Sequence, residues 1–383
     1  MAQPSRSTWR LLAVGPKPPP LNGTSVSFQN FCDEVARYAD QIQLTIIDTA
    51  PPQLKEKSKL FTFGNLSKVL EVLGSFLGNI GRTDRVIIVG SHQFLLTAGA
   101  LCLFIARLFG KPCAYRTFGY MDRYYESLSP AMQWFFRFVM GRLDNLIVET
   151  ELSYNNLKPV LGNKVSWIGG FRPMLEETDE TVLLKNTECN KLRLASLGQV
   201  REDKGIFVLL ESLRDPRIQA KSHIQCDIYG PLFQSISERF EEELSRTPNA
   251  HYCGIVNAEE AVATLSDYDA LIFPTFYKGE GHPGVIMEAM MAGIPVITTS
   301  FRSIPELIHN GENGLLVPPH DAKRLADAIE MVDLDRPLLE AMGQRNWEKR
   351  TAYDVREVVP LILQKIGISV AARDVTLDRH FLG

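Results

Sequence analysis

Short apolar runs separated by helical patterns recur along the whole chain, and this alternation restricts the fold more than any other feature. It is typical of parallel α/β sheets, whose strands are joined by helices. The predicted strands form two sets of five, near residues 10–15, 42–48, 85–90, 112–117 and 144–149, and near 192–197, 224–229, 251–254, 270–274 and 294–298. The sequence therefore predicts an α/β protein with two doubly wound domains that face a central cleft.

The length of 383 residues also favours two domains, because one ordinary hydrophobic core does not grow to that size. We expect a first domain over residues 1–175 and a polar, acidic linker over residues 176–190. A second domain is predicted over residues 191–354. A final helix from about residue 355 to 366 is followed by a tail without a clear pattern, up to residue 383.

The composition is that of a soluble globular protein, with 45% hydrophobic and 22% charged residues. The six cysteines are scattered without paired spacing, which favours a reducing compartment and argues against a zinc site or a disulfide framework. The first fourteen residues show no signal-peptide pattern. These observations predict a cytoplasmic protein.

The charge is unevenly distributed along the chain. Residues 1–175 carry 19 Lys and Arg against 12 Asp and Glu, whereas residues 176–383 carry 22 against 33. A basic first half indicates an anionic partner for that half. An apolar run at residues 94–106 and an aromatic, basic helix at residues 132–142 leave two interpretations open. Both are core helices, or they dock the first domain peripherally on an anionic membrane, which fits a lipid-linked acceptor.

Residues 270–297 carry the strongest chemical signal. Glu280 and Glu288 stand eight positions apart, joined by a Gly/Pro-rich turn that opens a helix between two apolar strands. The turn lies at the carboxyl end of a strand, where open α/β sheets bind ligands. The first helical amides, near Gly284 to Ile286, favour an anion. Carboxylates for hydroxyls and amides for phosphoryl oxygens together predict a sugar nucleotide as ligand.

The sequences Glu-Gly-His-Pro-Gly, starting at Glu280, and Glu-Ala-Met-Met-Ala-Gly-Ile-Pro-Val-Ile, starting at Glu288, resemble a known signature. It is the Glu-x₇-Glu motif of the retaining nucleotide-sugar glycosyltransferases of family four, which have two Rossmann-like domains in the GT-B arrangement. The resemblance implies that Glu280 lies against the donor sugar as the catalytic residue and that Glu288 holds the ribose hydroxyls. It also implies that the final helix crosses back to the first domain. The neighbouring residues implied in donor binding are Gly281, His282, Pro283, Gly284 and Val285.

The loop Leu197-Gly-Gln-Val-Arg-Glu-Asp-Lys-Gly follows the first strand of the second domain and opens a helix. It resembles the family's Gly-Arg-x₄-Lys-Gly loop, whose basic residues hold the donor diphosphate. Lys204 matches the lysine, and an ammonium suits a pyrophosphate. The usual arginine position holds Gln199, and an arginine stands two residues later, at Arg201. Either Arg201 reaches the phosphate from a shifted place, or Gln199 makes a weaker neutral contact.

Other positions are matched less closely. The proline-rich loop after the first strand resembles the family's Pro-Pro-x-x-Gly-Gly loop, with Asn22 in place of one glycine before Gly23. The turns with Gly230 and Val256 correspond to those that approach the nucleotide base. Relatives often carry a histidine where this chain has Phe118 and Gly119, so that contact is not carried over. Further candidates at strand ends, facing the cleft and the acceptor, are His92, Arg116 and Asp122.

Two acidic motifs are predicted to be structural. Ser303-Ile-Pro-Glu306 resembles a stretch of the same family, but it also has the spacing of a helix capping box, followed by a Gly-Glu-Asn-Gly turn, and we favour the structural interpretation for Glu306. Asp333-Leu-Asp335 resembles a metal-binding Asp-x-Asp in spacing, but it lies between two helical stretches, where aspartates cap helices. No metal site is therefore expected.

The sequence thus predicts a retaining glycosyltransferase that moves a sugar from a nucleoside diphosphate onto an acceptor hydroxyl. The acceptor is expected to be a saccharide or a lipid-linked saccharide, in surface polysaccharide or glycolipid assembly. No cofactor beyond the nucleotide-sugar co-substrate, no metal and no nucleic-acid partner are predicted. Three alternatives remain open: a sugar-nucleotide epimerase or a phosphorylase of the same architecture, and a non-catalytic binding subunit.

Overall fold

The computed structural model describes residues 8–19, 22–50, 63–174 and 191–370. They form two compact units. The first unit runs to Pro173 and includes the segment from Asp354 onward, and the second comprises Met174–Tyr353. The predicted linker at 176–190 lies outside the described residues, and so does most of the tail, from 371 onward.

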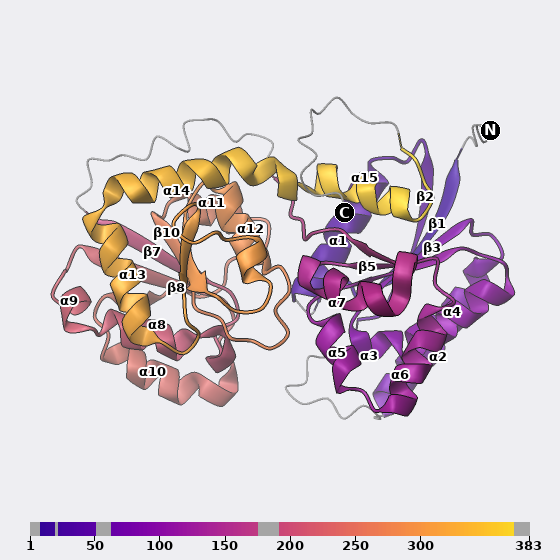
Figure 1. Cartoon of the computed structure of the whole chain (residues 1–383), viewed down its shortest axis with the longest axis horizontal. Coiled ribbons are helices and arrows are strands. Elements are labelled where there is room, and N and C mark those ends of the chain that lie inside the picture. Colours follow the sequence, from indigo (N-terminus) through magenta and orange to yellow (C-terminus); the bar gives the residue numbers. More distant parts are fainter. Residues whose placement is uncertain (1–7, 20–21, 51–62, 175–190, 371–383) are drawn as a thin grey trace. The chain divides into compact units, whose positions relative to one another are not determined.

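The first unit contains a parallel sheet with the strand order β2-β1-β3-β4-β5-β6 (Figure 1). Its strands are β1 (Trp9–Gly15), β2 (Ile42–Asp48), β3 (Arg85–Gly90), β4 (Cys113–Thr117), β5 (Asn145–Val148) and β6 (Val165–Trp167). Its helices are α1 (Gly23–Ala36), α2 (Phe63–Ile80), α3 (His92–Leu95), α4 (Ala98–Leu108), α5 (Met121–Ser127), α6 (Pro130–Met140), α7 (Glu151–Leu161) and α15 (Val355–Lys365), with the 3₁₀ turn η1 (Gly162–Lys164).

Helices cover both faces of this sheet, because successive side chains of a strand point to opposite faces. Leu12 and Val14 of β1 pack in one core with α2, α4 and α6. Leu11 and Ala13 pack in a second core with α1 and α15. The last helix, α15, therefore belongs to the first unit and lies against α1 (Figure 1).

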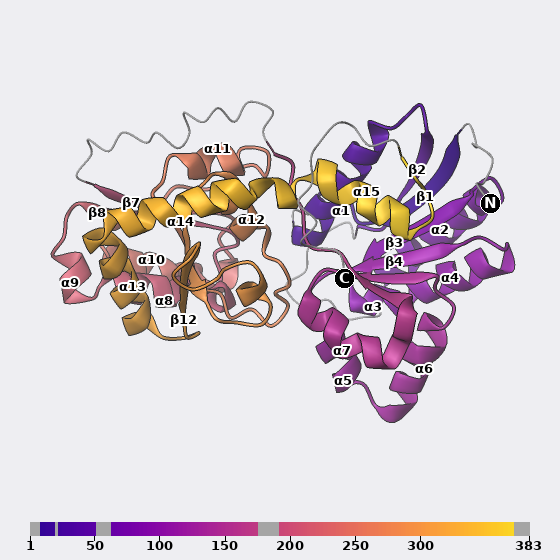
Figure 2. The same cartoon turned by 45° about the horizontal axis from the view of Figure 1, so that its top comes forward.

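The second unit contains a parallel sheet with the order β12-β11-β10-β7-β8-β9. Its strands are β7 (Leu192–Leu197), β8 (Ile224–Tyr229), β9 (Ala250–Tyr252), β10 (Ala270–Phe273), β11 (Val296–Thr299) and β12 (Gly314–Val317). Its helices are α8 (Ile206–Leu213), α9 (Pro216–Gln219), α10 (Ser237–Ser245), α11 (Ala261–Ser266), α12 (Gly284–Met291), α13 (Ala322–Leu334) and α14 (Arg336–Lys349), and its 3₁₀ turns include η3 (Glu202–Lys204), η4 (Gln234–Ile236), η5 (Ile304–Glu306) and η6 (Arg350–Tyr353). Helices α8 and α13 pack together on one face of this sheet (Figure 2), and α12 lies in the core on the other.

The prediction of two Rossmann-like α/β domains is confirmed, and all ten predicted strands are present with ends shifted by at most about two residues. Two strands were missed, β6 and β12. Both are short and both lie at an edge of their sheet. An edge strand has one neighbour instead of two, so its sequence needs no long apolar run. In β12 the strand also begins directly after the glycine-rich turn that the sequence suggested.

Each sheet has a point at which the strand order reverses. Counted from β9 inward, the second sheet has the order 3-2-1-4-5-6 of dinucleotide-binding sheets, with its switch point between β7 and β10. In the first sheet the switch point lies between β1 and β3. Ligands bind such sheets outside the carboxyl ends of the strands at this point. The loops after β7 and β10 in the second unit are therefore the first place to look for a site.

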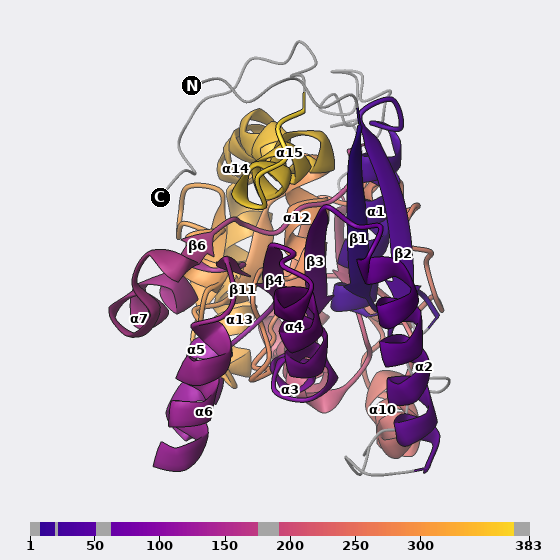
Figure 3. The same cartoon turned by 90° about the vertical axis from the view of Figure 1, so that its right-hand side faces the viewer.

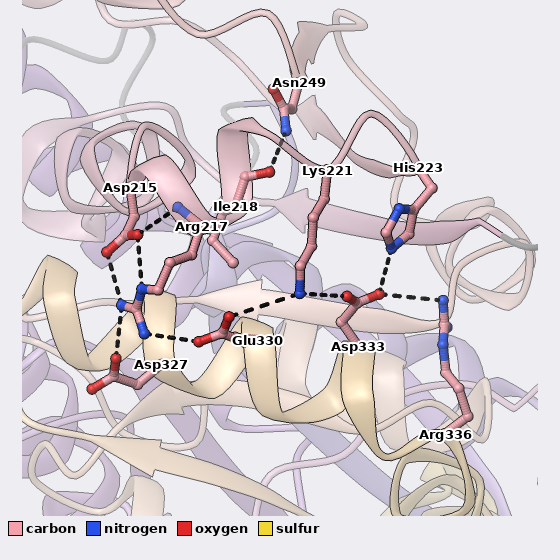
Figure 4. Close-up of polar contacts among 10 residues, drawn as sticks. All are labelled: Asp215, Arg217, Ile218, Lys221, His223, Asn249, Asp327, Glu330, Asp333 and Arg336. Atoms are coloured by element: carbon pink, nitrogen blue, oxygen red, sulfur yellow. Dashed lines mark hydrogen bonds and ion pairs between the residues drawn. The ribbon is translucent and has the colours of Figure 1, made fainter.

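The aspartates of Asp333-Leu-Asp335 have structural roles, as predicted. Asp333 contacts Lys221 Nζ at 3.0 Å and His223 Nε2 at 2.8 Å, and this connects α13 to the turn before β8 (Figure 4). Asp335 is the N-cap of α14, where its carboxylate accepts from the amide of Leu338 at 3.0 Å. The contacts drawn in Figure 4 connect α13 to α9, through Arg217, and to the turn before β8, and so they stabilise the packing of these elements.

Candidate donor site

Two loops meet outside the carboxyl ends of β7 and β10. Gly205 has a φ of 84° and lies so close to the second loop that a Cβ atom would be 2.1 Å from the carbonyl oxygen of Pro274. The amide of Phe276 donates to the carbonyl of Asp203 at 2.9 Å. Only glycine fits this approach without strain. The loop after β7 is therefore held firmly against the loop after β10.

This contact brings Lys204 and Glu280 together although they are 76 positions apart. Lys204 Nζ donates to Glu280 Oε1 at 2.5 Å, and Thr275 Oγ1 donates to the same oxygen at 2.8 Å. Glu280 is buried, whereas the side chain of Lys204 remains partly exposed. The two charged residues singled out in the sequence thus form one ion pair at the switch point.

Arg201 lies beside the same pair of loops. Its guanidinium donates to Gln199 Oε1 at 3.3 Å and to Asp203 Oδ2 at 2.6 Å. It also lies over the ring of Tyr277, 5.0 Å from the centroid, and Lys204 Nζ is 4.7 Å from the same centroid. Both cations therefore flank one aromatic ring. Gln199 and Arg201, the two alternatives for the phosphate contact, therefore lie side by side and both remain candidates.

Helix α12 begins directly after the Glu280 loop. Its N-cap is Pro283, and no side chain among the described residues caps it. The amides of Gly284 and Val285 therefore open the helix without a side-chain acceptor, which suits an anion. Glu288 lies about one turn into the helix and is buried.

His282 and Gly281 are held by the loop after β11. Nε2 of His282 is 2.9 Å from Glu306 Oε2, and the hydroxyl of Ser303 donates to the carbonyl of Gly281 at 2.7 Å. Ser303 makes no capping hydrogen bond, so the predicted capping box is wrong. Its spacing was right for a cap, but the tertiary fold offers both side chains partners on the Glu280 loop instead.

Gly230 and Val256 lie in the turns after β8 and β9. Gly230 has a φ of 132°, and a Cβ atom there would be 1.7 Å from the carbonyl oxygen of Gly198. Its amide donates to Gly254 at 2.7 Å. Val256 packs partly buried against the core that contains α12. The turns after β7, β8 and β9 therefore meet through glycine backbones.

Asn22, Gly23 and His92 are the candidate residues of the first unit near β1 and β3, and each has different neighbours. Asn22 is the N-cap of α1 and forms a capping box with Ser25. A Cβ atom on Gly23 would meet open space, so the protein itself does not require glycine there. The ring of His92 packs on Tyr124, with centroids 4.2 Å apart, and burial lowers the pKa of His92.

Arg116 and Asp122 are buried inside the first unit, contrary to the prediction that they face a cleft. The guanidinium of Arg116 donates to the carbonyls of Ile168 and Gly169, and burial lowers its pKa to about 10. Asp122 accepts from Ser153 Oγ at 2.8 Å and ties α5 to α7. A charged residue at a strand end can point into the domain as well as out of it, and only packing decides which.

Sequence patterns did not mark Thr275 or Tyr277, and they marked Glu306 only as part of a capping box. Thr275 is fully buried, and its carbonyl accepts from Thr299 Oγ1 at 2.5 Å, which connects it to β11. A single threonine or tyrosine near a strand end is common, so no spacing rule would have selected Thr275 or Tyr277, and the spacing that selected Glu306 predicted a different role for it. They become site residues through contacts with Glu280, Lys204 and His282.

The sequence also predicts no metal site and leaves open whether the first domain docks on a membrane. Among the described residues, no group of three or more His, Cys, Asp or Glu side chains could hold a metal ion. Within the same residues, every helix is too short or too polar to span a bilayer.

Comparison with known proteins defines the class. Residues 191–332 match the family model described as Glycosyl transferases group 1. Across nearly the whole chain the fold matches HepE of Anabaena, crystallised with UDP, with a TM-score of 0.68 at 16% identity over 94% of this chain and 100% of that one. Sucrose-phosphate synthase of Thermosynechococcus elongatus gives 0.71 at 17% identity over 93% and 98%. These likenesses establish the fold as that of GT-B glycosyltransferases.

Curated relatives agree with this class. WcaL of Salmonella typhimurium, provisionally named as a colanic acid biosynthesis glycosyltransferase, is 32% identical over 41% of this chain and 40% of its own. The sulfoquinovosyl transferase SQD2 of Arabidopsis thaliana is 25% identical over 92% and 72%. The chain spans about two fifths of the length of the first relatives that it matches. The second unit thus resembles the group 1 glycosyl transferases, and the chain as a whole has the GT-B fold.

Proposed function

We propose that this protein is a retaining glycosyltransferase that moves a sugar from a nucleoside diphosphate to an acceptor hydroxyl. The second unit binds the donor and the first unit binds the acceptor. The observation that carries the proposal is the meeting of Lys204 and Glu280 at the switch point, next to the uncapped start of α12. Cations and amides suit a diphosphate, and a buried carboxylate suits a sugar.

The chemistry follows from where charge develops. The bond between the anomeric carbon and the diphosphate breaks, and a bond to the acceptor oxygen forms on the same face of the sugar. Lys204, Arg201 and the amides of Gly284 and Val285 stabilise the negative charge on the departing diphosphate. The diphosphate accepts the proton of the acceptor hydroxyl. Glu280 orients the sugar and stabilises its developing positive charge.

Glu288 holds the ribose hydroxyls, and the turns with Gly230 and Val256 line the base. We propose that binding needs no metal, since Lys204 and Arg201 supply two positive charges beside Tyr277. Two relatives support a saccharide acceptor, because one is named for capsular polysaccharide biosynthesis in Staphylococcus aureus and the other, WcaL, for colanic acid biosynthesis. A cytoplasmic protein that contacts the membrane peripherally would fit such an acceptor.

The first test is a thermal-shift panel of UDP, GDP, ADP and CMP with a chelator present. A ligand at about 100 times its dissociation constant adds about 2.7 kcal/mol to the free energy of unfolding. We expect one nucleotide to stand out, and its sugar derivatives are then tested as donors. No binding with or without magnesium would refute the donor site.

The second test is turnover. With the donor found, proton NMR of the product gives its anomeric configuration, and inversion would contradict the proposed mechanism. Glu280→Gln should abolish most turnover while the melting temperature shows an intact fold. Near-normal activity of Glu280→Gln would exclude its catalytic role. Binding without turnover across donors and acceptors would favour a non-catalytic subunit.

A further inference from the structure

The outer helices of the first unit expose large apolar side chains. On α4 and the turn after it these are Leu101, Leu108 and Phe109, and on α6 they are Met132 and Trp134. Leu108 is 83% exposed and Trp134 is 61% exposed. We call these five residues the apolar ridge. Single exposed apolar residues are ordinary, but a contiguous group marks an interaction surface.

Ring contacts connect the α4 part of the ridge to the α6 part. Phe104 of α4 lies 5.9 Å from Phe138 of α6, measured between ring centroids. Trp134 stacks on Phe138 with centroids 5.4 Å apart. Leu101, Phe104 and Leu108 are three and seven positions apart, so they lie along one side of α4. Helices α4 and α6 pack on the same hydrophobic core as α2, and α4 contacts α2 (Figure 3).

The ridge is surrounded by positive charge. Arg107, Lys111, Arg137 and Arg142 belong to α4, α6 and the turns that follow them, and residues 86–121 and 127–143 contain no Asp or Glu. The guanidinium of Arg142 lies 3.4 Å from the ring centroid of Phe138, directly within the aromatic group. One neighbouring carboxylate, Asp144, pairs with Arg107 at 3.0 Å. The remaining cations give the surface a net positive charge.

We propose that the apolar ridge docks the first unit on an anionic lipid bilayer. Trp134 and Leu108 enter the boundary between headgroups and acyl chains, and the surrounding cations contact the anionic headgroups. A second copy of the chain is a poorer occupant, because two such surfaces would bring like charges together. The ridge shares no residue with the proposed donor site, so docking can be measured without turnover.

The test is co-sedimentation of the full chain with vesicles. Vesicles of phosphatidylcholine alone are compared with vesicles of equal parts phosphatidylcholine and phosphatidylglycerol. We expect binding to the anionic vesicles only, weakened by salt. The double variant Trp134→Ser/Leu108→Ser should bind them about tenfold more weakly or worse. The charge variant Lys111→Glu/Arg137→Glu should also lose binding.

The matched control is Met331→Ala/Leu334→Ala, which removes two exposed apolar side chains of α13 in the second unit. It should bind vesicles as the wild type does. Melting temperature and nucleoside diphosphate binding show whether each variant is folded, and they also separate failure of docking from failure of the donor site. Equal sedimentation of wild type and ridge variants would overturn the proposal. So would a wild-type dimer on size-exclusion chromatography that the ridge variants break, because the occupant would then be a second copy.

Discussion

Glu280→Gln should bind nucleoside diphosphates more tightly than the wild type while losing turnover. The reason lies in the ion pair of Lys204 with Glu280, whose atoms are 2.5 Å apart. A diphosphate that recruits the Lys204 ammonium has to replace this contact, so the carboxylate competes with the ligand. It also repels the ligand directly, since both are negative. Glutamine keeps the shape of the side chain but removes the charge.

The magnitude follows from the kind of hydrogen bond. A hydrogen bond between charged groups in a partly buried site contributes about 1.5–3 kcal/mol. The pair is well enclosed, since the side chain of Lys204 is 18% exposed and that of Glu280 is 6% exposed. Part of the contact survives, because the amide oxygen of glutamine still accepts from Lys204. We therefore expect a gain of about 1.4 kcal/mol, or about a tenfold lower Kd.

Isothermal titration calorimetry measures this effect with the diphosphate that the thermal-shift panel selects. Glu330→Gln serves as the control, because it removes one negative charge from α13, where Glu330 pairs with Arg217 at 2.8 Å outside the proposed donor site. Its Kd should stay within about twofold of the wild-type value. If Glu280→Gln binds the diphosphate equally or more weakly, Glu280 and the diphosphate do not compete for Lys204, and the phosphate assignment of Lys204 fails.

Three further changes test separate parts of the structure. Thr275→Val removes the hydroxyl that donates to Glu280 at 2.8 Å, so kcat should fall about tenfold. Thr275→Ser restores a hydroxyl and should recover kcat. Unchanged kcat in Thr275→Val would show that Lys204 alone orients the Glu280 carboxylate. Arg201→Met should weaken diphosphate binding about tenfold. The melting temperature should stay unchanged, because the partly exposed ion pair of Arg201 with Asp203 contributes little stability. Unchanged affinity would leave the phosphate contact to Lys204 and the amides of α12. Burial raises the pKa of Asp333, but the hydrogen bonds and charges of Lys221 and His223 outweigh it, so its pKa is lowered in the folded protein. Its stabilisation is therefore present above the ordinary Asp pKa of about 3.9 and lost as the pH falls through the lowered value. Asp333→Asn should cost about 1–3 kcal/mol in urea unfolding at pH 7, with a gap to the wild type that closes in acid; a gap independent of pH would contradict this role.

Most of the fold could be predicted because its signal is local. A buried parallel strand requires a run of apolar residues between turn residues, and β10 shows this with Ala-Leu-Ile-Phe, all four of them buried. The strands β6 and β12 escaped because edge strands are under a weaker requirement. The capping box at Ser303 failed for a related reason: local spacing was compatible with a cap, and long-range contacts determined the outcome.

The sequence by itself determined which segments form strands and helices, and it marked Glu280, Glu288 and Lys204 through two motifs that each span only a few neighbouring residues. Only the tertiary structure decided that Lys204 and Glu280 form a pair, that Thr275 supports it, and that Arg116 and Asp122 point inward. These outcomes depend on the order of strands in the sheet and on side-chain packing. Both join residues far apart in the chain, where local sequence patterns carry no information about distance.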